Sequence, residues 1–322
     1  HHVRVDRSAF DWLVQVEGEN AAGSIVVPYD FQSGRELVLD MERLVLPGDD
    51  EIEATPDDVD PRSLPPIVVR AGEFAIGTRY LGQVDASFRH TADGLESENI
   101  TATDATFDIA ATGGWVVDES NPRGSRSYVT ASLTSRDVER TMQRLDYSPG
   151  ILSEDLSMLL DLSWSGGPSE DFLESLNGDV EVRIGSGQLG EVDPGAGRMF
   201  GLLSVVALPR RLALDFRDVF GKGFGFDKIS GDFRVVDGAT YTCNLSLEGP
   251  AANIGIVGRA DMIATDYEQA AVVSANFGNT LPVVGGVLGG PQVAAVMLVF
   301  SQIFKKPLQE ATEIYYTIEG DW

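Results

Sequence analysis

The residues that could act as nucleophiles or bases are few in this sequence, and their spacing does not suit catalysis. His90 is the only histidine beyond the first two positions, and it lies in the polar segment 89–94, which predicts a turn. Gly185-Ser186-Gly187 lacks the five-residue Gly-x-Ser-x-Gly spacing of a nucleophile elbow. Cys243 is the only cysteine, so the chain can form neither an internal disulfide nor a cysteine-based zinc site. We therefore expect no nucleophilic catalysis and a surface position for His90.

Acidic residues crowd the segment 47–66, where they are Asp49, Asp50, Glu51, Glu53, Asp57, Asp58 and Asp60. This spacing lacks the glycine and the terminal glutamate of an EF-hand calcium loop. The segment is also rich in proline and poor in apolar residues, so it predicts a long exposed loop rather than a metal site. Paired carboxylates could hydrolyse a glycosidic bond, but 50 acidic residues produce such pairs by chance. A hydrolase that uses such a pair is therefore only a remote alternative, and we expect no metal and no cofactor.

The composition restricts the partners of the chain. The formal net charge of −26 opposes binding to nucleic acid, and it opposes anchoring to anionic lipid head groups through basic residues. Residues 1–2 are both histidine, which is typical of a purification tag, and the chain shows no initiating methionine or N-terminal apolar segment. We expect a fragment whose targeting information lies upstream.

Apolar residues alternate with polar ones over most of the chain, which is typical of strands with one dry and one wet face. The turn signal Asp237-Gly238 and other Gly, Pro and Asn clusters separate these segments. The pattern predicts antiparallel sheet buried on one side. The residues assigned to the dry face include Trp12, Val14, Leu39, Met41, Val129, Ala131, Leu160, Leu162, Trp164, Val182, Ile184, Leu214, Phe216, Tyr241, Cys243, Leu245 and Leu247.

Three segments predict short helices within this β-type sequence. Ser135 can cap a helix that runs to Leu145, and Asp193-Pro194 can begin a helix over about 194–208. The third is the apolar segment 292–304, which follows a glycine-rich stretch and is too short to cross a bilayer. It is ordinarily a buried core helix, with an interfacial or re-entrant segment as the alternative.

The glycine-rich segment 221–226 lacks the spacing of a phosphate-binding loop. It predicts either a flexible turn or a mobile aromatic loop. In the second case Phe220, Phe224 and Phe226 would enter an interface while the Lys222 ammonium stays in water.

The C-terminal half contains an ordered set of motifs that resembles a known family. These are Glu191-Val192-Asp193-Pro194-Gly195-Ala196-Gly197-Arg198, Ala207-Leu208-Pro209-Arg210-Arg211-Leu212, Phe220-Gly221-Lys222-Gly223-Phe224, Ile229-Ser230-Gly231-Asp232-Phe233 and the closing Gly320-Asp321-Trp322. Together they resemble the C-terminal region of the YhdP family of AsmA-like envelope proteins. The resemblance covers about 177–322, whereas 3–176 carries no diagnostic motif and is expected to form an upstream β-groove segment.

The resemblance implies a mainly β protein whose elongated, curled antiparallel sheet forms a groove, a β-taco-like arrangement with a few short helices. It implies a periplasmic location in a Gram-negative bacterium, with an inner-membrane anchor in the missing upstream chain. It also implies noncatalytic phospholipid transport between the inner and outer membranes, with this chain at the end near the outer membrane. The expected partners are phospholipid acyl chains and the outer membrane or a partner on that side.

Under this hypothesis the dry-face residues line a lipid groove, since an uncovered apolar face invites association. The membrane-facing end would comprise Phe220, Lys222, Phe224, Phe226, Val293, Val296, Met297, Phe300 and Phe304. Ordinary packing between two sheets explains the same residues equally well. An envelope scaffold or tether with a protein-filled core is therefore the alternative function.

Overall fold

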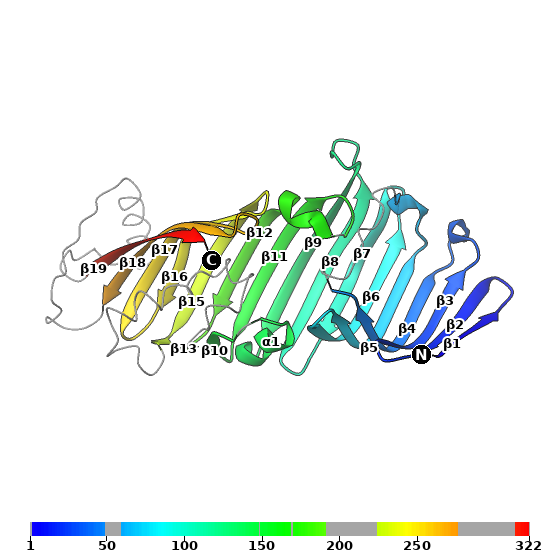
Figure 1. Ribbon diagram of the computed structural model, residues 1–322, viewed down its shortest axis with the longest axis horizontal. Helices are drawn as coiled ribbons and strands as arrows, with labels where there is room; N and C mark the ends of the chain where they lie inside the picture. The colour runs from blue at the N-terminus through cyan, green and yellow to red at the C-terminus, as the bar shows by residue number, and fades with distance from the viewer. Residues whose placement is uncertain are drawn as a thin grey trace. The chain divides into compact units, whose positions relative to one another are not determined.

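The structure is a computed structural model that describes residues 2–48, 59–147, 149–168, 170–190, 224–275 and 313–321. These residues form a mainly β fold, as the alternation predicts (Figure 1). The larger sheet has the strand order β1-β2-β3-β4-β5-β6-β7-β8-β9-β11-β12-β15-β16-β17-β18-β19, and a small sheet has the order β10-β13-β14.

The strands of the larger sheet follow the chain order. They are β1 (His2–Arg7), β2 (Asp11–Glu17), β3 (Ala21–Pro28), β4 (Leu37–Leu46), β5 (Ile67–Ile76), β6 (Arg79–His90), β7 (Gly94–Thr103), β8 (Phe107–Val117), β9 (Ser125–Ser135), β11 (Leu156–Ser165), β12 (Asn177–Ile184), β15 (Lys228–Val236), β16 (Ala239–Glu248), β17 (Ala252–Asp261), β18 (Asp266–Ala275) and β19 (Glu313–Asp321). The small sheet contains β10 (Ile151–Ser153), β13 (Gly187–Leu189) and β14 (Phe224–Phe226).

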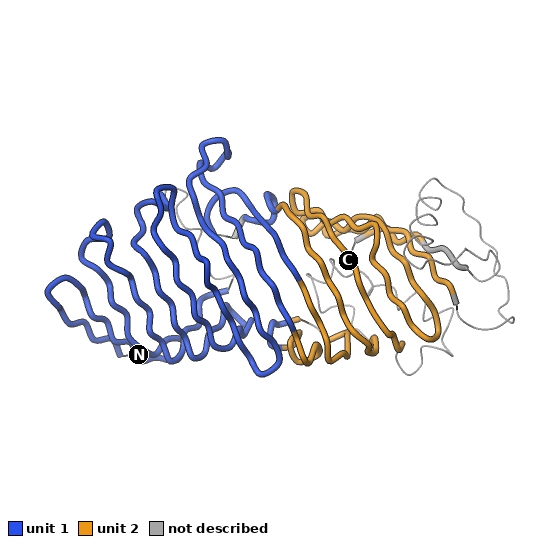
Figure 2. Tube along the Cα trace, turned by 180° about the vertical axis from the view of Figure 1, so that it is seen from behind, with its two compact units in different colours: residues 1–134, 144–146, 159–176 blue, residues 135–143, 147–158, 177–322 orange. Residues whose placement is uncertain are grey.

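The chain divides into two compact units (Figure 2). Unit 1 comprises residues 1–134, 144–146 and 159–176, and unit 2 comprises 135–143, 147–158 and 177–322. The domain boundary expected after residue 176 stays a prediction.

One strand pair departs from the expected antiparallel meander. β4 and β5 are parallel, with Leu37 opposite Ile67 and Leu46 opposite Ile76. A parallel pair needs a connection that returns along the whole strand, which is about 33 Å for ten residues. The acidic segment 47–66 makes this connection, which explains its length.

The described end of this connection contains a short 3-10 turn, η2 (Pro61–Ser63). Asp60, one of the clustered acids, caps the turn by accepting a hydrogen bond of 2.9 Å from the backbone N–H of Arg62. Its carboxylate also pairs with the Arg62 guanidinium at 2.7 Å. The remaining clustered acids, from Asp49 to Asp58, lie outside the described residues.

The helix expected after Ser135 is present as α1 (Val138–Arg144). Asp137 rather than Ser135 caps it, since the Asp137 carboxylate accepts from the backbone N–H of Arg140 at 3.1 Å. Val138 and Met142 are buried. The helices expected over 194–208 and 292–304 lie outside the described residues. Two further 3-10 turns are η1 (Phe31–Ser33) and η3 (Glu170–Ser175).

The expected turn at Asp237-Gly238 joins β15 to β16. Both residues have positive φ, 46° and 77°, as a two-residue type I′ hairpin turn requires. Here the local turn signal correctly predicts the hairpin.

Candidate functional site

One face of unit 1 carries apolar side chains on seven successive strands, from β2 to β8. Val14 pairs with Ile25, Ile25 with Leu39, and Leu39 with Val69. The register continues this line through β6, β7 and β8. We call it the open row: Val14, Ile25, Leu39, Val69, Ala86, Ile100 and Ala111.

A second apolar line runs beside the open row on the same face. It comprises Val16, Gly23, Met41, Ala71, Val84, Ala102 and Ile109. At the other end of the strands, Leu37 pairs with Ile67 and Ile67 with Phe88. Since side chains two residues apart share a face, these lines together form a continuous apolar surface across the strands.

The opposite face of the same strands is more polar. One line across it contains Gln15, Ser24, Asp40, Arg70, Asp85 and Thr101. The next line on this face begins with the apolar residues Leu13, Val26, Val38 and Val68 and continues with Ser87 and Asn99. Arg70 and Asp85 form an exposed ion pair at 3.8 Å. The polar line is suited to water, and the face of the open row is the more continuously apolar of the two.

The open row is only partly covered. Six of its members, all except Ala86, are half-buried rather than buried. The second line is better covered, because Met41, Ala71, Val84 and Ala102 are buried. At the edge of this surface Trp12 remains 39% exposed. A packed protein core would bury such side chains almost completely.

β11 contributes Leu160, Leu162 and Trp164, all half-buried. Between them, Asp161 accepts a hydrogen bond from the Thr130 hydroxyl of β9 at 3.4 Å, which places both polar groups on one face. The leucines therefore lie on the opposite face, as the alternation predicts. The Trp164 indole N–H donates to the Gly167 carbonyl at 2.9 Å, and its ring lies 5.6 Å from Phe172.

Unit 2 also has an apolar line across its strands, but its side chains are fully covered. Ile184 pairs with Ile229, Ile229 with Leu247, and Leu247 with Ile254. We call this the buried row: Ile184, Ile229, Leu247, Ile254 and Val273. Each member is at most 2% exposed. The predicted residues Val182 and Leu245 are buried to the same extent.

A β-bulge in β16 interrupts the alternation that the sequence predicts there. β16 has one more residue than its partners between Thr242 and Leu245, so the side chains before and after this point exchange faces. Tyr241 and Cys243 are therefore exposed, and the prediction that they share the dry face with Leu245 is wrong. Thr242 pairs with the buried Phe233 instead.

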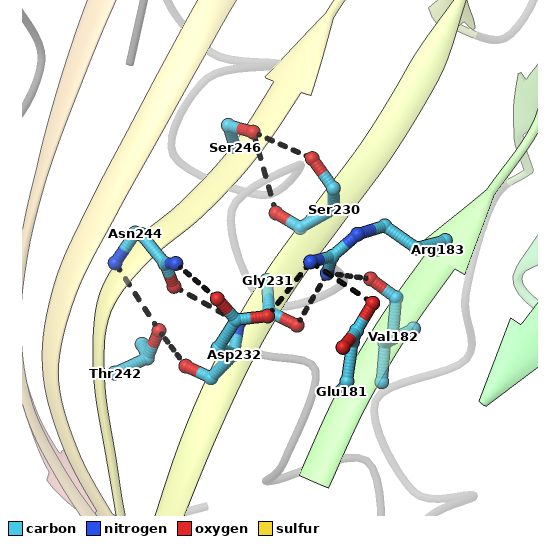
Figure 3. A network of polar contacts seen from close by, with 9 residues as sticks. All are labelled: Glu181, Val182, Arg183, Ser230, Gly231, Asp232, Thr242, Asn244 and Ser246. Atoms are coloured by element: carbon cyan, nitrogen blue, oxygen red, sulfur yellow. Dashed lines mark hydrogen bonds and ion pairs between the residues drawn. The ribbon is translucent and has the colours of Figure 1, made fainter. Parts of the chain in front are cut away.

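Polar groups hold this bulge in place in unit 2 (Figure 3). The Asn244 amide donates to the Asp232 carboxylate at 2.7 Å, and its carbonyl accepts from the Asp232 backbone N–H at 2.9 Å. The Thr242 hydroxyl donates to the Asp232 carbonyl at 2.9 Å, and the Arg183 guanidinium donates to the carboxylate at 2.9 Å. We call these four residues the bulge clamp.

The Asp232 carboxyl is the charged centre of the bulge clamp. Partial burial on its own raises the pKa of this carboxyl, but the hydrogen bonds from Arg183 and Asn244 outweigh that effect. The pKa of Asp232 therefore lies below its usual value. Arg183 also pairs with Glu181 at 3.1 Å, so the cation bridges two carboxylates.

A family model described as YhdP protein matches residues 1–322. The chain belongs to the YhdP family. It is also 27% identical over 260 residues to the intermembrane phospholipid transporter YhdP of Escherichia coli strain K12. The aligned part is 80% of this chain and 20% of that relative, so the chain spans about a fifth of the relative's length. No solved structure matches the chain.

Of the residues predicted for the groove and for its membrane-facing end, two are buried in a short strand and nine lie outside the described residues. Phe224 and Phe226 belong to β14, a strand rather than a loop, and are 4% and 3% exposed. Leu214, Phe216, Phe220, Lys222, Val293, Val296, Met297, Phe300 and Phe304 lie outside the described residues. The membrane-facing role of these residues stays a prediction.

Two further observations concern membranes and metals. Within the described residues, no helix is long and apolar enough to span a membrane. The same residues contain no group of three or more His, Cys, Asp or Glu side chains placed to hold a metal ion. His90 lies at the end of β6, exposed, with its Nδ1 3.0 Å from the Leu64 carbonyl.

Sequence reasoning missed an aromatic cluster at the edge of the apolar surface. Trp12 and Tyr29 meet edge to face with ring centroids 5.3 Å apart, and the Arg7 guanidinium lies over both rings. Alternation can assign Trp12 to a face, but Tyr29 lies just after β3 and Arg7 is charged, so neither fits an apolar pattern. Only the register, in which Arg7 pairs with Trp12, brings them together.

Proposed function

We propose that the chain conducts phospholipid without catalysis, and that acyl chains lie on the apolar face of unit 1. The proposal combines membership of the YhdP family with the geometry of the open row. In the full protein this face would form part of a groove between the inner and outer membranes, in the periplasm. We further propose that this chain lies near the outer membrane and that an inner-membrane anchor lies upstream.

The observation that carries the proposal is the open row, which runs across seven strands and is half-buried at six of its seven members. Strands spaced about 4.8 Å apart give it a length of about 29 Å over six steps. An acyl chain that fills one leaflet of a hydrocarbon core about 30 Å thick is about half that length. Each methylene moved from water to such a surface contributes about 0.8 kcal/mol and needs no directed contact. Lipid chains would thus cover this face without a fixed register, which suits movement along it.

The polar line on the opposite face supports the same function. Asp40, Arg70 and Asp85 keep that line in water, so the face of the open row is the better surface for lipid. The excess of 50 acidic over 24 basic residues adds solubility to a protein with an exposed apolar surface.

A scaffold or tether is the second candidate function, and the buried row favours it. Side chains at most 2% exposed behave as an ordinary core and leave no room for a lipid chain beside them. In this case Val182, Ile184, Leu245 and Leu247 would stabilise unit 2 instead of contacting lipid. The role of these four residues in lining a lipid groove therefore belongs to the first proposed function and not to the scaffold.

The proposal can be tested with two adjacent leucines of β11. Leu160 is half-buried and lies on the face of β11 opposite Asp161, whereas Leu159 is 47% exposed and shares the face of Asp161. We expect wild-type protein purified from cells to carry phospholipid that is detected by mass spectrometry of the organic extract. Leu160→Asp should strongly reduce this lipid because a carboxylate on the surface repels acyl chains. The matched control Leu159→Asp should retain it.

Circular dichroism should show that both variants stay folded. Lipid-free wild-type protein would contradict the proposal and favour the scaffold. Equal loss of lipid in both variants would contradict the assignment of the lipid to one face.

A further inference from the structure

Arg7 is a cation on the apolar face of unit 1. It pairs with Trp12 across β1 and β2, and it shares its face with Val5, which pairs with Val14 of the open row. Its guanidinium carbon lies 5.0 Å from the centroid of the Trp12 ring and 5.6 Å from that of Tyr29. The two rings therefore position a positive charge at the edge of an apolar surface.

The cluster around Arg7 is held in place before any ligand binds. The Tyr29 hydroxyl donates to the Ser8 carbonyl at 2.9 Å, and Arg7 Nε lies 3.5 Å from the Tyr29 hydroxyl oxygen. Trp12 and Tyr29 are each 39% exposed, so the rings and the cation remain accessible.

Arg7 has no carboxylate within 4 Å among the described residues, although acids outnumber bases two to one in the chain. Its neighbours do have such partners. Arg4, on the opposite face of β1, pairs with Asp6 at 2.8 Å. Asp11, four residues beyond Arg7, is occupied by Arg35 through two hydrogen bonds of 2.8 and 2.6 Å. The guanidinium of Arg7 thus keeps donors for an anion that comes from outside.

We propose that Arg7 binds the phosphodiester of a phospholipid whose acyl chains lie along Val5, Val14 and Ile25. The inference rests on the proposed function, since it assumes that lipid chains occupy the apolar face. A planar guanidinium can donate two parallel hydrogen bonds to a phosphate. The rings beneath it exclude water from one side and contact the glycerol end of the lipid.

This arrangement gives the bound lipid one orientation along the strands. The head group lies at the end of β2 that carries Trp12, and the chains extend toward Val16 and across the open row. A lipid without phosphate would gain the apolar contacts but not the bonds to Arg7.

The test compares three probes by isothermal titration calorimetry at physiological salt: dihexanoyl-phosphatidylglycerol, dihexanoylglycerol and inorganic phosphate. We expect the wild-type chain to bind the phospholipid about tenfold more tightly than the diacylglycerol, as one charge-assisted contact provides. Arg7→Gln should remove this preference and leave diacylglycerol affinity unchanged. Arg7→Lys should retain part of it, because the charge remains but the paired donors are lost.

Arg4→Gln is the matched control, since it makes the same charge change on the same strand but on the opposite face. It should behave as wild type. Equal phospholipid affinity of wild type and Arg7→Gln would overturn the Arg7 site while leaving lipid conduction intact. Binding of neither lipid by wild type would overturn the proposed function itself. Inorganic phosphate that binds Arg7 as tightly as the phospholipid does would show a free-phosphate site and overturn the head-group assignment.

Discussion

The open row of unit 1 and the buried row of unit 2 are built from the same kinds of residue on the same kind of strand. Val14, Ile25 and Leu39 in the first row correspond in character to Ile229, Leu247 and Ile254 in the second. The members of the buried row are at most 2% exposed, whereas six of the seven in the open row are only half-buried. Alternation thus shows that a strand has a dry face, but not what covers that face.

We infer from this difference that the two units have different tasks. Complete burial of large aliphatic side chains is the main source of folding stability, so the buried row anchors unit 2. The half-buried row contributes less to stability and leaves apolar area available to a ligand.

Truncation of one leucine in each row should separate the two tasks. We expect Leu247→Ala to lower the free energy of unfolding by about 3 kcal/mol, because it leaves a cavity in a closed core. Leu39→Ala should lower it by about 1 kcal/mol, since its half-buried side chain loses less contact. Guanidinium titration followed by circular dichroism measures both values. Equal losses would remove the distinction between the rows.

The bulge clamp should contribute less than the buried row. Asn244→Ala removes two hydrogen bonds to Asp232, so we expect the free energy of unfolding to fall by about 1 to 2 kcal/mol. Arg234→Ala on β15 is the control, because it breaks only an exposed ion pair with Asp179 and should change stability by less than about 1 kcal/mol. A smaller effect of Asn244→Ala than of the control would show that the bulge needs no clamp.

The smallest expected effect concerns pH. Because the pKa of Asp232 is lower in the folded than in the unfolded chain, its contribution is complete above the unfolded pKa, about 3.9. That contribution disappears as the pH falls through the folded pKa. Asp232→Asn should therefore reduce the loss of stability between pH 5 and pH 3 by a fraction of 1 kcal/mol, since the group is half-exposed. Denaturation at the two pH values tests this, and an unchanged difference would show that Asp232 is not the group that titrates.

Much of the fold follows from the sequence, because side-chain period and turn chemistry are local properties. The alternation places Val14, Leu39, Met41 and Leu160 on strands, and Asp237-Gly238 correctly predicts the hairpin between β15 and β16. The helix after Ser135 is also predicted, within a few residues.

The predictions from alternation are wrong at two kinds of place. One is a strand with an inserted residue, and the other is a strand pair whose direction is set by the connection between the strands. The bulge in β16 inserts an extra residue, so Tyr241 and Cys243 leave the face that strict alternation assigns to them. The parallel pairing of β4 and β5 is set by the path of the connection between them, which the alternation of either strand does not encode.

The candidate site was harder to predict than the fold. The sequence identifies apolar faces, but the register decides that Val14, Ile25 and Leu39 form one line and that Arg7 lies beside Trp12. The burial of the side chains in each row depends on contacts between segments that are distant in the sequence. Only the structure therefore distinguishes the open row from the buried row.

The parallel pair has a consequence for the order in which the sheet assembles. Most neighbouring strands can form as hairpins, such as β6 and β7, whose loop has three residues from Thr91 to Asp93. Closing the twenty-residue connection 47–66 costs about 1.5 to 2 kcal/mol more in loop entropy than closing that three-residue loop. Hairpin propagation along the chain is therefore interrupted between β4 and β5. The first four strands can pair with one another early, but they join β5 only in a slower step, during which the edge of β5 stays open to pairing with another chain.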